Sequence, residues 1–312
     1  MSECIINDVV EKILLYGYGN NIQKLKTILY DKVNEKYLKR EKLGFVMPAF
    51  PGKSPNCNSS FSFLPDYTEN VSLETINDFI TEINKIYPYG CEFTIVHDGH
   101  FFSYVGITRG ELELNEYILS FRKKCGEWIT SVTIYDLMNS CDLYEAYLLF
   151  KNKYLDEMIS IGDLSNEILF TRNEFGDKIF KNGLSNNQKQ KIATNIARKS
   201  VLIKNGINNM INDLFPDSIR LSVHFQDKGS VKMGFKLIPL AINKGTPWFY
   251  VAYVSSCGKI ILGKNDWYFE SKKISTNKYG NFYSISDNDI YLFENNLVDR
   301  KIIRERRYNR CE

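Results

Sequence analysis

Short apolar runs alternate with amphipathic stretches over the first half of this chain, and this alternation restricts its fold more than any other feature. The apolar runs lie at 43–47, 92–96 and 129–135, and residues 73–87 and 112–124 between them carry apolar side chains at helical spacing. The runs have the length of buried strands, and the amphipathic stretches have the length of helices. Strands that alternate with helices usually form parallel sheets with both faces covered. We therefore predict an α/β fold.

The flanking regions are predicted to be helical at first and rich in strands later. Apolar spacing in residues 8–36 is helical but is interrupted by Gly-Tyr-Gly at 17–19, which predicts two N-terminal helices within 1–40. Residues 143–214 are predicted to be almost wholly helical. Four short strands are predicted after Pro216, at 218–224, 232–238, 248–255 and 259–262. Their short connections favour antiparallel pairing.

These regions together predict a single α/β domain over residues 1–312. We expect a mixed sheet with a Rossmann-like parallel part, antiparallel C-terminal strands and a helical middle layer formed by 143–214. No internal repeat or low-complexity linker marks a domain boundary. Ligands bind open parallel sheets at the carboxyl ends of the strands, so functional residues are expected there.

Composition removes several classes of function. The chain has 40 Lys and Arg against 37 Asp and Glu, without the concentrated basic surface of a nucleic-acid binder. No apolar stretch approaches the ~18 residues of a membrane span, and the N-terminus lacks a basic leader, so we expect a cytoplasmic protein. The seven cysteines are scattered without CxxC spacing and the three histidines form no metal motif, so neither a disulfide framework nor a metal site is expected.

A Gly-Lys-Ser segment at 52–54 invites comparison with a nucleotide-binding loop. A P-loop requires another glycine five residues before the Gly-Lys pair, where this chain has Met47, and a helix directly afterwards, which Pro55 disfavours. Lys53 and Ser54 on a rigid loop remain candidates for binding a phosphate or a carboxylate. The alternative is an exposed turn with a solvated lysine.

Asp98 follows the apolar run 92–96 and precedes Gly99. At the end of a strand, this carboxylate either accepts hydrogen bonds from the backbone of a turn or faces a ligand cleft. A place in proton transfer and a place as a turn cap are both consistent with the pattern.

Polar and apolar residues alternate in the predicted strand that begins at Ser218. Strand periodicity places Arg220, Ser222, His224 and Gln226 on one face, and Lys232 follows on the next predicted strand. This pattern predicts a polar, cationic wall. The wall either lines a ligand cleft or simply faces solvent.

Four segments resemble, in order and spacing, the isocyanide synthases of the pyoverdine/dityrosine biosynthesis protein family. The segments are Pro-Ala-Phe-Pro-Gly-Lys-Ser-Pro-Asn at 48–56, His-Asp-Gly at 97–99, Arg-Leu-Ser-Val-His-Phe-Gln at 220–226 and Thr-Pro-Trp at 246–248. The resemblance spans roughly residues 43–262. This chain departs from the family pattern at Phe249, where His is common, and at Phe225, where Pro is usual. Residues 57–60 are also less basic, and these departures concern the substrate more than the family.

The resemblance implies an enzyme of the lyase type that needs no metal and no cofactor. Such an enzyme joins an aromatic L-amino acid, with tyrosine favoured and tryptophan possible, to ribulose 5-phosphate, whose ketone carbon becomes the isonitrile carbon. The charge balance and the lack of a long apolar stretch lead us to expect no nucleic-acid or membrane partner. The resemblance implies an iron/2-oxoglutarate-dependent oxygenase as the partner in the pathway. A relative that forms N-formyl-tyrosine and a noncatalytic metabolite-binding homologue are the alternatives.

The resemblance also suggests roles for particular residues. The catalytic candidates are His224, Asp98 and Lys53. The candidates for binding phosphate or the amino-acid carboxylate are Lys53, Ser54, Arg220, Ser222 and Lys232. Which cation holds which anion is left open by the sequence.

Overall fold

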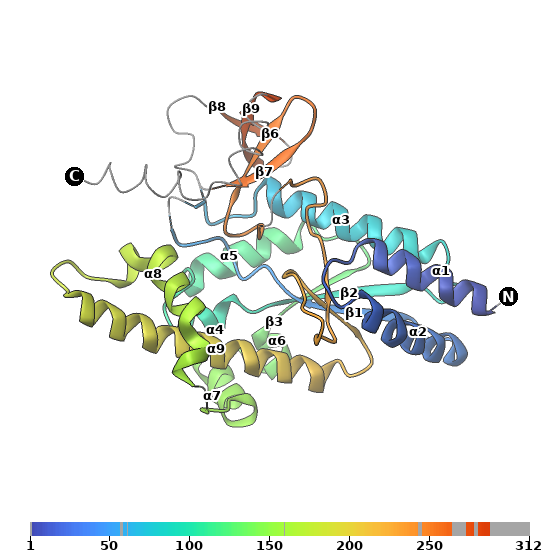
Figure 1. Cartoon of the computed structure of the whole chain (residues 1–312), viewed down its shortest axis with the longest axis horizontal. Coiled ribbons are helices and arrows are strands. Elements are labelled where there is room, and N and C mark those ends of the chain that lie inside the picture. The colour runs from blue at the N-terminus through green and yellow to red at the C-terminus, as the bar shows by residue number, and fades with distance from the viewer. Residues whose placement is uncertain are drawn as a thin grey trace.

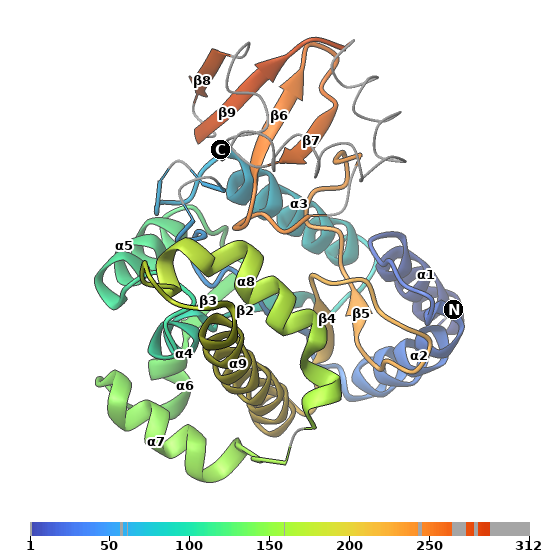
Figure 2. The ribbon, with the colours of Figure 1, turned by 60° about the vertical axis from the view of Figure 1, so that its left-hand side comes forward.

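Five parallel strands form the main sheet of the molecule, and its strands are labelled in Figure 1 and Figure 2. The computed structural model describes residues 2–56, 59–60, 62–158, 160–242, 245–263, 273–277 and 280–287. The strands of the main sheet are β1 (Leu43–Pro48), β2 (Cys91–His97), β3 (Ile129–Thr133), β4 (Ile219–Ser222) and β5 (Met233–Gly234), in the order β3-β2-β1-β4-β5. All neighbouring pairs are parallel, so the carboxyl ends of the five strands lie along one edge.

Helices cover both faces of this sheet, because successive residues of each buried strand point to opposite sides. The face that includes Phe45 and Phe93 packs against α1 (Ser2–Leu15), α2 (Ile22–Lys39), α3 (Tyr67–Asn84) and α5 (Glu111–Arg122). The face that includes Val46 and Val96 packs against α4 (Gly99–Tyr104), α6 (Ile134–Met138), α7 (Leu143–Tyr154) and α9 (Asn186–Leu214). The prediction of a covered parallel sheet is confirmed.

The predicted helical layer is also confirmed. Within 143–214 the chain forms α7, the 3-10 helix η1 (Ile161–Leu164), α8 (Ser165–Ile179) and α9. The apolar side of α8 and η1 packs on the N-terminal half of α9 through Leu164, Ile168, Ala193 and Ala197. Figure 2 shows α8 beside α9, with α9 running across one face of the main sheet. None of the helices in the described residues has both the length and the apolarity of a bilayer span.

The pairing of β4 and β5 differs from the prediction. These strands are parallel rather than antiparallel, and they end earlier than the predicted runs 218–224 and 232–238. Residues 18–20, which are far from both strands in the sequence, hydrogen-bond to the backbone just beyond β4 and at the end of β5. Tyr18 N donates to Gly234 O (2.9 Å) and Asn20 N donates to Gln226 O (2.8 Å). A Cβ at Gly234 would lie 2.1 Å from the Tyr18 carbonyl oxygen, so this close crossing requires glycine.

A second sheet is formed by strands from the C-terminal part of the chain, in the order β7-β6-β9-β8. Its strands are β6 (Val251–Ser255), β7 (Ile260–Gly263), β8 (Lys273–Asn277) and β9 (Gly280–Ile285). The β6 and β7 strands are antiparallel, which confirms the predicted pairing of these two strands. Figures 1 and 2 place this sheet beyond α3, with α3 between it and the main sheet. The fold is therefore mixed α/β, as predicted.

Candidate active site

The carboxyl edge of the main sheet carries three of the predicted site residues. Asp98 directly follows β2, Ser222 is the last residue of β4, and His224 lies two residues further on. The β1 strand lies between β2 and β4. Because neighbouring strands are spaced about 4.8 Å apart, the ends of β2 and β4 are about 10 Å from each other. This distance is short enough for one small substrate to reach both ends.

Asp98 is a half-buried residue whose carboxyl group lacks a complete set of partners. Its Oδ1 atom makes no hydrogen bond to the described residues. The loop after β1 lies against it, since a Cβ at Gly99 would be 2.0 Å from the Pro51 carbonyl oxygen. Burial raises the pKa of Asp98 to about 7. Near neutral pH this group is therefore able either to donate or to accept a proton.

The two histidines beside Asp98 are held by the protein. His97 Nδ1 lies 2.9 Å from the Phe50 carbonyl oxygen and Nε2 lies 2.7 Å from Ser131 Oγ. Desolvation lowers the pKa of His97 to about 4, so a neutral ring connects the loop after β1 to the middle of β3. His100 is also buried and its Nε2 lies 2.9 Å from Asn115 Oδ1, while its Nδ1 has no partner among the described residues.

A group of cations gathers on the side of β4 that faces α9. We define the cationic cluster as Lys204, Arg220 and Lys232, and the neutral imidazole of His224 lies beside it. Asn208 of α9 joins two of its members: Lys232 Nζ donates to Asn208 Oδ1 (2.7 Å), and Arg220 Nη1 donates to the Asn208 carbonyl oxygen (3.3 Å). Lys204 is one helical turn before Asn208.

The positive charge of the cationic cluster has no acidic partner in the part of the chain that the structure describes. Desolvation, followed by the charges of Arg220 and Lys204, lowers the pKa of Lys232 to about 8. Desolvation also lowers the pKa of Arg220 to about 10, and its buried Nε atom has no acceptor among the described residues. Neighbouring cations that are partly desolvated and lack a carboxylate favour the binding of an anion.

His224 presents an imidazole that is available for chemistry. Its backbone is held, because His224 N donates to Ser222 Oγ (3.2 Å) and Gln226 Nε2 donates to the His224 carbonyl oxygen (2.7 Å). The residue is exposed, and its ring makes no hydrogen bond to the described residues. Desolvation by the surrounding chain, followed by the charges of Lys204 and Lys232, holds its pKa below the usual range. The ring is therefore neutral at pH 7.

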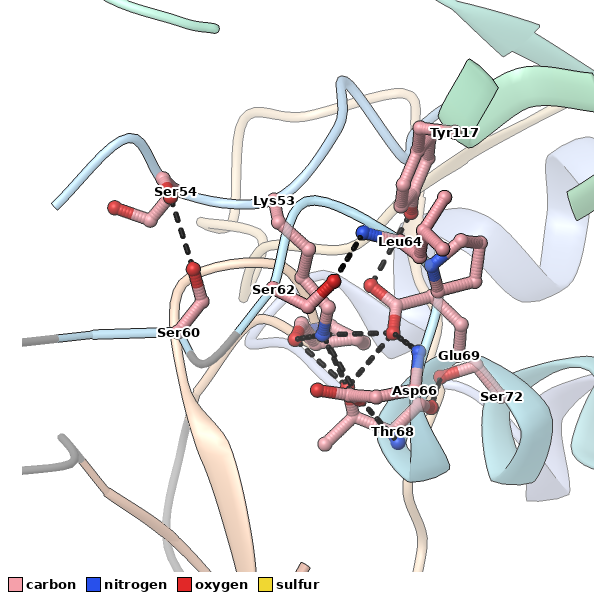
Figure 3. Close-up of polar contacts among 12 residues, drawn as sticks. Lys53, Ser54, Ser60, Ser62, Leu64, Asp66, Thr68, Glu69, Ser72 and Tyr117 are labelled. Atoms are coloured by element: carbon pink, nitrogen blue, oxygen red, sulfur yellow. Dashed lines mark hydrogen bonds and ion pairs between the residues drawn. The ribbon is translucent and has the colours of Figure 1, made fainter. Parts of the chain in front are cut away.

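Lys53 has surroundings of the opposite kind (Figure 3). Its ammonium group is fully buried and lies 2.9 Å from Asp66 Oδ1 and 2.7 Å from Glu69 Oε2. It also donates to Thr68 Oγ1 (3.0 Å) and to the Pro247 carbonyl oxygen (3.0 Å). The structure thus surrounds this cation with protein oxygens and does not bring it to the cationic cluster. The predicted contact of Lys53 with phosphate finds no support in this geometry.

The contacts of Lys53 form a buried network that fastens three segments together. Asp66 caps the N-terminus of α3 in a capping box with Glu69. Tyr117 of α5 donates its hydroxyl hydrogen to Glu69 Oε1 (3.1 Å). Desolvation raises the pKa of Glu69 to about 7 despite the nearby ammonium group. The network holds the loop after β1 against α3 and against the Pro247 backbone.

Ser54 is buried in the same loop. Its backbone N donates to the Trp248 carbonyl oxygen (2.8 Å), its Oγ accepts from Asn56 N (3.2 Å), and its own carbonyl oxygen accepts from Ser60 Oγ (2.9 Å). The loop is therefore neither an exposed turn nor a cradle of free donors. A phosphate contact by Ser54 stays a prediction.

Some residues of these two groups were not identified from the sequence. Asp66 and Glu69 carry a visible signal, because Asp-x-x-Glu before an amphipathic stretch is typical of a capped helix. Lys204 and Asn208 carry none, since polar residues four positions apart on a long helix are common. No group of three or more His, Cys, Asp or Glu residues that could hold a metal ion occurs in the described residues.

Comparisons with known proteins agree with the motifs. The family model for the pyoverdine/dityrosine biosynthesis protein matches residues 33–158 and 166–275. An L-tyrosine isonitrile synthase from Xenorhabdus nematophila is 29% identical over 296 residues, which cover 84% of this chain and 86% of that protein. An L-tryptophan isonitrile synthase from Fischerella ambigua is 27% identical over 226 residues, 67% of each chain.

A solved structure has the same fold. The crystal structure of the PvcA protein from Pseudomonas aeruginosa superposes with a TM-score of 0.78 at 22% sequence identity. The match covers 90% of this chain and 99% of that one. The arrangement of the sheet and its helices is therefore shared over nearly the whole of both chains.

Proposed function

Because the chain belongs to the pyoverdine/dityrosine biosynthesis protein family, we propose that it is an isonitrile synthase acting on an aromatic L-amino acid. Relatives that match most of the chain are named for this reaction on tyrosine or on tryptophan. We further propose ribulose 5-phosphate as the carbon donor, with no added cofactor or metal. Tyrosine is favoured because the relative from Xenorhabdus nematophila, which is named for tyrosine, matches 84% of this chain.

The observation that carries this proposal is the cationic cluster without an acidic partner. Lys204, Arg220 and Lys232 bring three positive charges near one asparagine. A sugar phosphate dianion and an amino-acid carboxylate together bring three negative charges. Phosphate and carboxylate are also the groups that lysine and arginine bind best. The charge of the site therefore matches the charge of the two proposed substrates.

The proposed chemistry also needs proton transfer. An amine that condenses with a ketone must lose protons, and the oxygen of the intermediate must be protonated before it leaves as water. In this proposal the neutral ring of His224 takes a proton from the amine, and Asp98, with a pKa of about 7, gives or receives the other protons. Asp98 follows β2 and His224 follows β4 at the same edge of the main sheet, so one substrate can reach both side chains.

Lys53 takes an indirect part in this proposal. Its network positions the loop after β1, which lies against the end of β2 beside Asp98. We therefore regard it as a positioning residue and leave phosphate binding to the cationic cluster. A pathway partner of the iron/2-oxoglutarate-dependent oxygenase class, acting on the isocyano product, stays a prediction.

The test is to incubate the protein with tyrosine and ribulose 5-phosphate labelled with carbon-13 at the ketone carbon, after treatment with a chelator. Mass spectrometry is expected to find an isocyano acid that carries one labelled carbon. A product heavier by one water would instead identify N-formyl-tyrosine. If neither tyrosine nor tryptophan gives a product although both substrates bind, the protein is a noncatalytic metabolite-binding protein.

A further inference from the structure

An apolar cavity of about 280 Å³ opens at the edge of the main sheet beside β4. It exists because β5 pairs only with Leu221 and Ser222, which leaves the first half of β4 uncovered. The wall is formed by α2, the C-terminal end of α9 and the two strands, mainly through Leu25, Ile28, Phe215, Val231, Met233 and Arg220. The site described above accounts for none of these apolar side chains.

Arg220 belongs both to this cavity and to the cationic cluster. Its guanidinium donates to Asn208, which also accepts from Lys232 of the cluster, and the residue lines the cavity as well. Lys232 lies between Val231 and Met233, which both line the cavity, but its own ammonium group is turned to Asn208. The apolar space is therefore bounded by Arg220 of the cluster and, on the α2 side, by Lys32, whose ammonium group already donates to the Pro216 and Ser218 carbonyl oxygens.

We propose that this cavity holds the side chain of the amino-acid substrate, whose carboxylate binds Arg220, so that Lys232 holds the phosphate and Lys204 attracts it from a longer distance. This assignment rests on the proposed function and adds an orientation of both substrates to it. An aromatic amino acid carries its carboxylate close to its ring. The apolar cavity and the guanidinium of Arg220 are adjacent in the same way.

Size and bonding geometry both support this orientation. Small-molecule sites have volumes of about 300–1,000 Å³, so this cavity suits a single ring and not a larger ligand. An aromatic side chain gains most of its binding energy by burying its ring. The planar guanidinium matches a carboxylate with two parallel hydrogen bonds. The Nε atom of Arg220, which lacks an acceptor among the described residues, would gain one in this way.

Filling the cavity tests the proposal directly. Ile28 is a partly buried residue of α2 in the cavity wall, and Ile28→Trp places a ring in the space. We expect the KM for tyrosine to rise at least about tenfold, because a filled pocket excludes the substrate ring, while the KM for ribulose 5-phosphate stays unchanged. Leu38→Trp on the same helix is the matched control, since Leu38 is 72% exposed and does not line the cavity. An unchanged KM for tyrosine in Ile28→Trp would overturn the proposal.

A crossed pair of variants tests the two anion assignments. Arg220→Gln is expected to raise the KM for tyrosine more than the KM for the sugar phosphate, and Lys232→Gln is expected to do the reverse. The opposite pattern would overturn the orientation. Thermal melting controls for folding, and if Ile28→Trp fails to fold, Ile28→Ala is used instead. The enlarged cavity is then expected to shift the preference from tyrosine towards tryptophan, and an unchanged preference would count against the cavity.

Direct binding separates this proposal from the proposed function. If the wild-type protein makes isonitrile while Ile28→Trp keeps a normal KM for tyrosine, the cavity assignment is wrong and the function stands. If the wild-type protein makes no isonitrile but binds tyrosine in a calorimetric titration, and Ile28→Trp weakens that binding, the function is wrong and the cavity assignment stands.

Discussion

The buried network of Lys53 and the cationic cluster that contains Lys232 differ in what surrounds the positive charge of the lysine. The ammonium of Lys53 has two carboxylate oxygens within 3 Å and is 0% exposed. The ammonium of Lys232 shares a neutral asparagine with Arg220 and has no carboxylate among the described residues. The protein itself neutralises the charge of Lys53, whereas the charge of Lys232 still requires an anion.

This difference shows that the position of a lysine in a conspicuous motif does not reveal its role. Taking an ammonium group out of water costs several kcal/mol, and this cost is offset only by well-placed opposite charges. Where the protein itself supplies those charges, as around Lys53, the lysine holds the structure together. Where it supplies only a neutral oxygen, as around Lys232, a bound anion completes the site.

The largest effect is expected from Lys53→Met. Removing the cation leaves Asp66 and Glu69 buried without their partner, and breaking a buried ion pair in this way costs about 3–5 kcal/mol of unfolding free energy. Chemical denaturation followed by circular dichroism measures this loss. The double variant Lys53→Met with Glu69→Gln should recover part of it, because one of the two unpaired charges is gone.

Lys85→Met is the control for a surface ion pair. Its side chain is 64% exposed and pairs with Glu82, so little change in stability is expected. Normal stability of Lys53→Met together with poor saturation by ribulose 5-phosphate would return Lys53 to the role of phosphate ligand and would remove the contrast between the two groups.

His224→Gln is expected to reduce turnover strongly while the protein stays folded. Glutamine keeps hydrogen bonds but cannot accept a proton, and losing a positioned acid or base typically lowers kcat by about 10²–10⁴-fold. The measurement is kcat at saturating concentrations of both substrates, with thermal melting as the folding control. Near-normal turnover would show that the imidazole only completes the polar surface of the cationic cluster.

The variant Asp98→Asn tests the raised pKa of Asp98 through the pH dependence of the free energy of unfolding. The pKa of Asp98 is raised from 3.8 to about 7, so between these values the folded state retains a proton that the unfolded state has lost. The wild type therefore loses stability as pH rises from about 4 to 7. The Asp98→Asn variant does not show this loss, because asparagine does not titrate. Relative to wild type, the variant should gain on the order of 4 kcal/mol from pH 4 to pH 8. Parallel stability curves for the two proteins would exclude a raised pKa at this position.

Local patterns in the sequence predicted those parts of the fold that depend on near neighbours. Apolar periodicity was enough for β1, β2 and β3, because each is a buried strand followed by its own helix. The parallel pairing of β4 and β5 was not predictable in this way. It depends on Tyr18 and Asn20, which lie about two hundred residues away and occupy the hydrogen-bonding positions beside Gly234 and Gln226.

The same limit applies to the candidate site. Strand alternation correctly put Arg220 and Ser222 on one side of β4, where they face α9. The neutralisation of Lys53 depends on side chains of α3 that the motif around Gly52 does not contain. The joining of Arg220 to Lys232 depends on Asn208, whose role is set by the packing of α9 on the sheet.

The smallest effect is expected from Lys204→Gln. Lys204 is exposed and makes no ion pair with the described residues, so it contributes mainly a long-range attraction to phosphate. We expect the KM for ribulose 5-phosphate to rise only a few-fold at low salt and the change to shrink as salt is added. A change as large as that of Lys232→Gln would place Lys204 in direct contact with the phosphate.

The most direct test of the contrast between the two groups is a calorimetric titration of ribulose 5-phosphate into the wild type and into the double variant Lys204→Gln with Lys232→Gln. Lys153→Gln, which removes an exposed lysine on α7 that pairs with Asp213, is the matched control. Loss of charge-assisted hydrogen bonds worth about 1.5–3 kcal/mol predicts an affinity that is roughly ten- to a hundredfold weaker in the double variant and unchanged in the control. An affinity in the double variant equal to that of the wild type would contradict the assignment of the cationic cluster as the phosphate site.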